Sequence, residues 1–506
     1  MSLEFTLDGR RVSVEDAETS LLEVLRDRLG ARSPKDGCSP QGQCGCCTVL
    51  VDGAPRVACV TPARRVAGRT ITTVEGLPDG ERQAWADAFC ATGASQCGFC
   101  TPGIVLRLAA LRTKGSTDVD GALLAHLCRC TGWRTIAEAF SAYGVESPPR
   151  DLEAASRRAT IEGGVPQRVA PDVALGGGGF ADDTAPIDAL VAVPDGLGGW
   201  AVGETLREAR RAAGKVQGRR TTAALRHPLE VPAGDWDVTL RTTWVEPAYL
   251  ELDASWCAPG GEPATPLANG GAFGGKAASV APAVARGLAD EHGRPVRVLL
   301  SREDAVRLGP KRPPVAAGAR ADGSGVMRVA RTTGVADLIH SFAPALSVEE
   351  VDVPGPPTSA ALRAAGWAEA HVLLSGAAGN AGPVRSPSGA VAEAEVSANG
   401  VRVRVACGDP LDEIVLRSYC IGAAHMALGW VWSEGIAVDA EGDPHDLTIR
   451  SFGILRARDM PPVEVEIDRS GGDPVNGSDA VFAAVAAAAW IGEGCVQDWP
   501  TRRRNV

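Results

Sequence analysis

The chain has 506 residues and a formal net charge of −11, and 14 of its residues are cysteines. This length allows three or four domains. Because the basic residues form no dense stripe, neither nucleic acid nor an anionic membrane surface is an expected partner.

The sequence predicts neither a membrane span nor a secretory signal. Its longest uncharged apolar run, residues 480–491, is too short to cross a bilayer. The N-terminal sequence lacks a basic head followed by an apolar stretch. We therefore expect a cytoplasmic location, where thiols stay reduced and available to metals.

Residues 1–77 have the pattern of a small sheet with a thiol-rich loop. EFTLDGRRVSV alternates around Asp8-Gly9 and TVLVDGAPRVACV turns at Asp52-Gly53, so both predict β-hairpins. Thr19-Ser20 precedes LLEVLRDRL, which predicts a short amphipathic helix. The order hairpin, helix, thiol loop, hairpin is typical of a β-grasp ferredoxin.

Four cysteines of this region match the plant-type [2Fe-2S] spacing, C-x4-C-x2-C followed by a distant cysteine, with one departure. The first interval here has five residues, so an extra residue is expected to bulge within 39–43. Cys46 is interpreted as a bystander because CTVLVDG anchors Cys47 as the ligand. A four-thiolate zinc site is the competing interpretation, although such sites usually have closely spaced C-x-x-C pairs. The predicted ligands are Cys38, Cys44, Cys47 and Cys59.

Residues 78–145 are predicted to form a small helical bundle with two further cysteine pairs. Helices are expected at ERQAWADAFCAT, GIVLRLAALRTKG, DGALLAHL and WRTIAEAFSAYG. Each pair falls in a turn between helices, so two turns can present four sulfurs to one cluster. Cys90, on an apolar helix face, is expected to be structural. The predicted ligands are Cys97, Cys100, Cys128 and Cys130, although this spacing alone also allows zinc.

The motifs QCGFCTPG and LCRCTG, directly after a ferredoxin-like region, resemble the iron–sulfur subunit of the xanthine dehydrogenase and aldehyde oxidoreductase family of molybdenum hydroxylases. The resemblance covers residues 2–145, with His126 where the family usually has Asn. It implies two [2Fe-2S] clusters in series, the helical-domain cluster nearest a molybdopterin cofactor and the ferredoxin-like cluster passing electrons to FAD. It also implies that Gln96 and Cys130 touch the pterin; a surface amide in a turn is the competing interpretation of Gln96.

Residues 146–172, rich in proline and charge, are predicted to be a linker. Beyond it, GGAFGGK at 270–276 resembles the GGGFGGK loop of the family's molybdopterin-binding subunit, which implies cofactor contacts for Gly271, Phe273 and Gly274. A Walker A loop is not expected, because Ala277 stands where a P-loop needs Ser or Thr. TSAALRAAGWAEAH resembles the family's Arg-bearing loop and implies a cofactor contact for Arg363.

The remaining sequence resembles a shortened copy of that subunit. WAVGETLREARRAAGKV is similar to the end of the family's hammerhead domain, so 173–247 is predicted to be a reduced hammerhead-like segment and 248–506 a truncated molybdopterin-binding-like region. The missing material falls between about 372 and 385, where the family has a second cofactor loop. The family's catalytic Glu lies in a G-E-P context, and the nearest match here is Asp473, one methylene shorter. A misplacement of about 1 Å can cost about 100-fold in rate.

These observations predict an α+β multidomain protein: a β-grasp [2Fe-2S] domain, a helical [2Fe-2S] domain and a shortened α/β molybdopterin-domain-like module. We expect an electron-transfer subunit of a molybdenum hydroxylase whose C-terminal half is a non-catalytic scaffold; structural roles for Lys276, Arg363 and Asp473 are equally compatible. Expected partners are a full-length molybdopterin-binding subunit and an FAD-binding subunit, in a dimer of heterotrimers. The alternatives are a self-sufficient molybdopterin enzyme and a zinc-bound structural or interaction protein.

Overall fold

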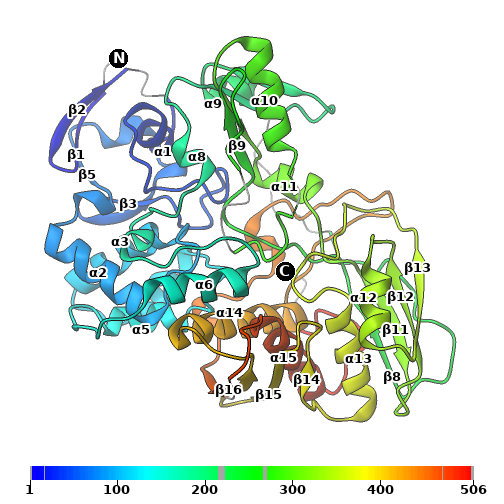
Figure 1. Cartoon of the computed structure of the whole chain (residues 1–506). Helices are drawn as coiled ribbons and strands as arrows, with labels where there is room; N and C mark the ends of the chain where they lie inside the picture. The colour runs from blue at the N-terminus through cyan, green and yellow to red at the C-terminus, as the bar shows by residue number, and fades with distance from the viewer. Residues whose placement is uncertain are drawn as a thin grey trace.

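The structure is a computed structural model of the whole chain and describes residues 3–15, 18–214, 223–265, 271–277, 279–469 and 471–502. In this described part the strands form one five-stranded sheet and three four-stranded sheets. Figure 1 shows the N-terminal sheet and the helices that follow it, blue to cyan, beside the three later sheets. Helix α14 (Glu413–Trp432) packs against both α6 (Leu152–Gly163) and α15 (Ser478–Gly492). It therefore connects the helices that follow the N-terminal sheet with the C-terminal part of the chain.

The N-terminal sheet has the order β2-β1-β5-β3-β4, and both predicted hairpins are confirmed. Asp8 and Asp52 have positive φ angles, as do the glycines that follow them, which gives the tight turns that join twisted strands. The predicted helix begins at Ser20, whose side chain accepts a hydrogen bond from the Glu23 N–H. The elements are β1 (Leu3–Leu7), β2 (Arg10–Val14), α1 (Leu21–Glu23), its π-helical continuation η1 (Val24–Arg28), β3 (Thr48–Val51), β4 (Ala54–Val57) and β5 (Thr70–Thr72).

The second part is helical, as predicted. Pro102 lies in the first turn of its second helix, where a missing N–H costs nothing. Asp118 caps the third helix by accepting a hydrogen bond from the Gly121 N–H at 2.9 Å. The helices are α2 (Asp79–Thr92), α3 (Thr101–Thr113), α4 (Val119–Ala122) and α5 (Arg134–Ser141).

The segment interpreted as a linker contains a packed helix, which corrects the sequence interpretation. Helix α6 starts at Asp151, whose carboxylate accepts from two backbone N–H groups. Its buried face includes Arg158 and Glu162, whose side chains pair with each other at 3.0 Å. Because this face carries a buried ion pair as well as small apolar residues, hydrophobic periodicity does not reveal the helix.

The second sheet crosses the predicted boundary at residue 247. Strand β6 (Leu190–Pro194) pairs in parallel with β10 (Val296–Leu299), and β10 pairs with β9 (Ala254–Cys257). Strands from 190–203 and 254–299 therefore share one sheet, and the division into 173–247 and 248–506 is wrong at this point. The other elements here are α7 (Pro171–Ala174), α8 (Ala181–Thr184), β7 (Trp200–Gly203), α9 (Leu206–Ala212), α10 (Ala281–His292) and α11 (Arg302–Leu308).

The third and fourth sheets complete the C-terminal part. The third has the order β13-β12-β11-β8 and the fourth the order β14-β15-β16-β17. Helix α13 ends at Ala378, and residues 379–383 lead directly to β14, where the sequence lacks the family's second loop. The elements are β8 (Val238–Arg241), β11 (Val315–Ala319), β12 (Gly325–Ala330), α12 (Val335–Phe342), β13 (Leu346–Val351), α13 (Trp367–Ala378), β14 (Val384–Arg385), β15 (Val391–Ser397), β16 (Gly400–Ala406) and β17 (Val463–Asp468).

Helix α14 is long and apolar enough to cross a membrane by length and composition. Within the chain, however, 89% of its apolar window is buried, mainly against α15 and α6. A helix in the core of a folded domain has this same character.

A buried histidine in α13 gives a pH prediction. Burial lowers the pKa of His371 from 6.5 to about 4, so the unfolded chain binds a proton that the folded chain refuses. Stability is therefore lost as the pH falls from about 6.5 toward 4. We expect His371→Gln to lose roughly 1 kcal/mol less stability than wild type between pH 7 and pH 5.5, measured by denaturant unfolding. His340→Gln, a change on the exposed face of α12, should match wild type; equal pH sensitivity in both variants would contradict the prediction.

Candidate metal centres

Four thiols of the N-terminal part form one buried group, which we call the loop quartet: Cys38, Cys44, Cys47 and Cys59. Three lie in the loop before β3, and Cys59 lies in the turn that follows β4. Their side chains contact one another in the order Cys44, Cys38, Cys59, Cys47. The sequence prediction named these same residues, and the structure brings them together.

Backbone N–H groups point at the sulfurs of the loop quartet. The N–H groups of Gln41 and Gln43 lie 3.2 and 3.5 Å from Cys38 Sγ, and the Cys59 N–H lies 3.4 Å from Cys47 Sγ. Ser39 has a φ of 40°, so the chain turns within the stretch where the extra residue was expected. Such donors suit thiolates, whose negative charge they stabilise.

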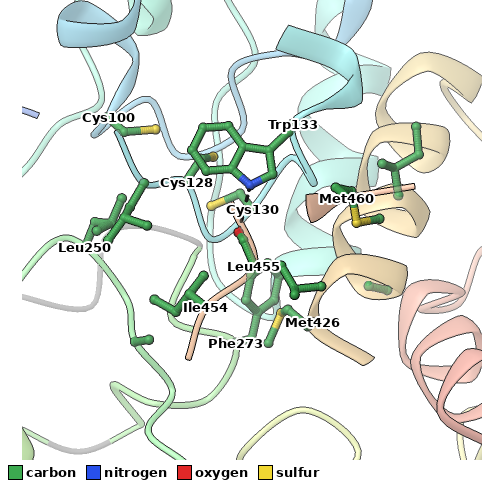
Figure 2. Packing of buried hydrophobic residues seen from close by; sticks show 14 of the residues in the cluster. Cys100, Cys128, Cys130, Trp133, Leu250, Phe273, Met426, Ile454, Leu455 and Met460 are labelled. Atoms are coloured by element: carbon green, nitrogen blue, oxygen red, sulfur yellow. Dashed lines mark hydrogen bonds between the residues drawn. The ribbon is translucent and has the colours of Figure 1, made fainter. Parts of the chain in front are cut away.

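The second group, which we call the helical quartet, consists of Cys97, Cys100, Cys128 and Cys130. The first two lie in the turn before α3 and the last two in the turn before α5. Cys97 and Cys130 are 3.6 Å apart at their sulfurs, and the contacts continue from Cys130 to Cys128 and from Cys128 to Cys100. Figure 2 shows Cys100, Cys128 and Cys130 beside the ring of Trp133, whose Nε1–H donates to the Leu455 carbonyl at 3.0 Å.

In both quartets each thiol contacts one or two of the others, and the contacts run from one thiol to the next. Among the described residues, no three His, Cys, Asp or Glu side chains converge on a position for one metal ion. Contact with Cys44 lowers the pKa of the Cys38 thiol, and contact with Cys100 lowers that of Cys128, each well below the usual range. A lowered pKa favours the thiolate form of a cysteine, which is the form that binds metals.

The two quartets are separated by one layer of backbone. The Leu127 N–H donates to the Cys44 carbonyl at 2.9 Å, and a Cβ on Gly103 of α3 would lie 2.5 Å from the Gly45 carbonyl oxygen. Cys46, the predicted bystander, is fully buried in this layer, beside Cys44 and within electrostatic range of Cys128. His126 is buried here too, and burial lowers its pKa to about 3.

The C-terminal part covers the Cys130 side of the helical quartet. Gly422 of α14 touches it so closely that a Cβ there would lie 1.7 Å from the Cys130 carbonyl oxygen. A Cβ on Gly271 would lie 2.8 Å from Cys130 Sγ and 3.3 Å from Cys97 Sγ. Gln96 donates to the Cys130 carbonyl at 3.1 Å and to Ser418 Oγ at 2.9 Å, so it lies beneath α14 and is no surface amide. Predicted residues Gly271, Gln96 and Cys130 therefore meet in one place.

Phe273 and Arg363 meet on the far side of the glycine loop. The Arg363 guanidinium lies 3.9 Å from the centre of the Phe273 ring, and its Nε lies 3.0 Å from Asp479 Oδ1. A Cβ on Gly274 would lie 1.7 Å from the Ala361 carbonyl, which locks the two loops together. A cavity of about 570 Å³ opens beside them, lined by residues of the glycine loop, the Arg363 loop, the end of α6 and the start of α15. Gly270, the first residue of the GGAFGGK motif, lies outside the described residues.

Lys276 is one of the residues that line this cavity, whereas Asp473 is not. Asp473 is exposed and does not line the cavity, whereas Asp479, which the sequence did not single out, does. Burial raises the pKa of Asp479, and Arg363 opposes that effect. Lys276 is buried and paired with Glu251 at 2.7 Å, the structural role that the sequence left open. Asp479 lies at the start of α15, six residues after Asp473, and no sequence motif marks it.

Known proteins with similar sequences match the first third of the chain. A family described as "[2Fe-2S] binding domain" matches residues 73–141. The nicotinate dehydrogenase small FeS subunit of Eubacterium barkeri is 38% identical over 152 residues, which cover 29% of this chain and 96% of that protein. The xanthine dehydrogenase iron-sulfur-binding subunit of Escherichia coli O157:H7 is 37% identical over 144 residues, 27% of this chain and 89% of that protein. The chain belongs to the xanthine dehydrogenase family of molybdenum hydroxylases.

In three-dimensional structure, the similarity to known molybdenum hydroxylases covers nearly the whole chain, including the part that follows the iron–sulfur region. The aldehyde oxidoreductase from Desulfovibrio desulfuricans superposes with a TM-score of 0.71 at 14% identity, covering 97% of each chain. The chain therefore has the aldehyde oxidoreductase fold, with mixed α/β sheets after a [2Fe-2S] domain. It is a component of a molybdenum-dependent oxidoreductase, and its N-terminal part is similar to the iron–sulfur subunits of those relatives.

The residues present fit iron–sulfur clusters, and other parts of the chain lie close to Cys130. Both quartets supply four thiols, and N–H donors aim at the sulfurs of the loop quartet. At Cys130, a Cβ added at Gly271 would lie 2.8 Å from the sulfur, and one added at Gly422 would lie 1.7 Å from the carbonyl oxygen. These two glycines therefore cover one side of Cys130, the residue for which a pterin contact is predicted.

Proposed function

We propose that this chain holds two [2Fe-2S] clusters, one in each quartet, and conducts electrons between them within a molybdenum hydroxylase. The observation that carries the proposal is the pair of four-thiol groups separated by one layer of backbone. When bound, a [2Fe-2S] cluster carries one electron at a time, whereas hydroxylation of a substrate releases two. The chain's task is to hold the two sites at a fixed separation and to keep water from them.

Two features support the direction from the helical quartet to the loop quartet. Helix α14 and the glycine loop cover the Cys130 side of the helical quartet, whereas Val60, next to Cys59, is 49% exposed. We therefore assign the exit to the Cys59 edge, where an FAD-binding partner would dock. The sequence predicts such a partner because residues 1–145 and 170–506 are already assigned to other domains.

The C-terminal part is proposed to be a non-catalytic scaffold. Asp473 is exposed, residues 379–383 are too few to form a second cofactor loop, and the Cys130 edge is closed. A full-length molybdopterin-binding partner would then send electrons across Gly271 and α14 rather than by contact with Cys130. A cytoplasmic dimer of heterotrimers is the corresponding proposal for the whole assembly.

Purification of the tagged chain from its native host tests the assembly. A flavoprotein and a molybdopterin-binding subunit should co-purify, and the chain expressed alone should contain little molybdenum. Near-stoichiometric molybdenum in the chain alone would instead support a self-sufficient enzyme, for which the cavity beside Arg363 is the available space.

Visible absorption tests the zinc alternative. Oxidised [2Fe-2S] clusters are red-brown and zinc thiolates are colourless, so a coloured chain with little zinc supports the proposal. The pairwise contacts of the thiols also favour a binuclear cluster, in which each iron takes two cysteine ligands.

A further inference from the structure

Arg129, which lies between the predicted ligands Cys128 and Cys130, is buried and fully paired. Its side chain is only 4% exposed. The Nε–H donates to the Pro247 carbonyl at 3.0 Å, and the two terminal nitrogens donate to the two carboxylate oxygens of Glu434 at 2.5 and 2.7 Å. This bidentate geometry is the strongest form of an ion pair between side chains.

Glu434 is held as rigidly as Arg129. It follows the end of α14, its side chain is 2% exposed, and its N–H donates to the Gly429 carbonyl at 2.7 Å. A Cβ on Gly429 would lie 2.2 Å from Glu434 Oε1, so the carboxylate lies directly against the helix backbone. Pro247 and Glu434 both belong to the C-terminal part, which therefore reaches into the turn that carries two ligands.

We propose that Glu434 is a positioning residue that neutralises the charge of Arg129 and thereby sets the reduction potential of the helical-quartet cluster. The inference rests on the proposed function, because it requires a cluster on Cys128 and Cys130. Reduction adds one negative charge to a cluster, and a buried positive charge nearby favours that change strongly where water is excluded. The paired carboxylate cancels most of this effect. The C-terminal part thus has an electrostatic role beside its structural one.

The test is a redox titration of the full-length chain, followed by the EPR signals of the two reduced clusters. A Cys59→Ser variant, altered only in the loop quartet, identifies which signal belongs to which cluster. Glu434→Gln keeps an acceptor for Arg129 and removes the negative charge. We expect it to favour reduction of the helical-quartet cluster about tenfold, which is an upward shift of about 59 mV, and to leave the loop-quartet cluster unchanged.

Two further variants separate charge from shape. The double variant Arg129→Gln with Glu434→Gln has no net charge at the site, like wild type, and should keep the wild-type potential. Arg129→Lys keeps the positive charge and should also keep the wild-type potential. It should lose some stability, because lysine cannot form the bidentate contact that the arginine guanidinium makes. An upward shift of about 59 mV in either variant would show a structural role only and would overturn the inference, also in the case that Glu434→Gln does not fold.

Glu369→Gln is the matched control. Glu369 forms a bidentate buried pair with Arg312 at 2.7 and 2.9 Å, away from both quartets, so its loss should move neither potential. An unchanged helical-quartet potential in Glu434→Gln, with full iron content, would refute the inference while leaving the two-cluster proposal intact. Wild-type protein without iron would instead refute the proposed function.

Discussion

Replacing Cys47 with alanine is expected to remove half of the iron from the chain, from about four atoms to about two. Cys47 is buried, its sulfur accepts the Cys59 N–H, and its thiol contacts Cys59 at the end of the loop quartet. With only three ligands left, the loop quartet should lose its cluster. The thiols of the helical quartet contact one another and not Cys47, so this quartet should keep its cluster. Iron analysis and the EPR spectrum after reduction measure the loss, which should remove one of two signals.

Cys46→Ala provides the matched control for this prediction. Cys46 directly precedes Cys47 and its thiol is equally buried, yet this thiol touches only the Cys44 end of the quartet. We expect about four iron atoms and two EPR signals in this variant. If Cys46→Ala lost the cluster and Cys47→Ala kept it, the ligand assignment would be reversed.

Replacing Gly422 with alanine is expected to destabilise the whole chain at the contact between α14 and the helical quartet. The new methyl carbon would lie 1.7 Å from the Cys130 carbonyl oxygen, a backbone atom next to a predicted ligand. Overpacking of this kind typically costs about 1–3 kcal/mol. Thermal unfolding should occur at lower temperature, and iron should be lost from the helical quartet before the loop quartet.

Gly287→Ala is the control, because this glycine also lies inside a helix. It is exposed in α10 and nothing lies within 4 Å of an added Cβ, so alanine should leave stability unchanged or raise it by about 0.5–1 kcal/mol. If both variants unfolded at the wild-type temperature, α14 would not lie as close to Cys130 as the structure places it.

Local sequence signals were sufficient for the iron–sulfur part. The turns at Asp8-Gly9 and Asp52-Gly53 need residues that tolerate a positive φ, and the structure has both hairpins there. The order and spacing of eight cysteines predict two groups of four ligands, and the structure brings the thiols of each group together. The cysteine spacing does not predict that a single layer of backbone separates the two quartets, because this depends on the contact between Gly103 and Gly45.

The sequence does not predict three features that depend on contacts between distant residues. Helix α6 was missed because Arg158 and Glu162 are buried as a pair, which breaks the apolar pattern. The predicted domain boundary at residue 247 is wrong because β6 pairs with β10, which lies about a hundred residues later in the chain. Pairing between strands so far apart in sequence leaves no local signal. The loop resemblance predicts a cofactor contact for Arg363 but not its partner Asp479, because the G-D-P resemblance indicates Asp473, which is exposed.

Iron and acid-labile sulfide, assayed on anaerobically purified wild-type chain, test the central claim most directly. Two binuclear clusters predict about four iron atoms and about four sulfides per polypeptide. Values near zero, or about two of each, would contradict the assignment of a cluster to each quartet.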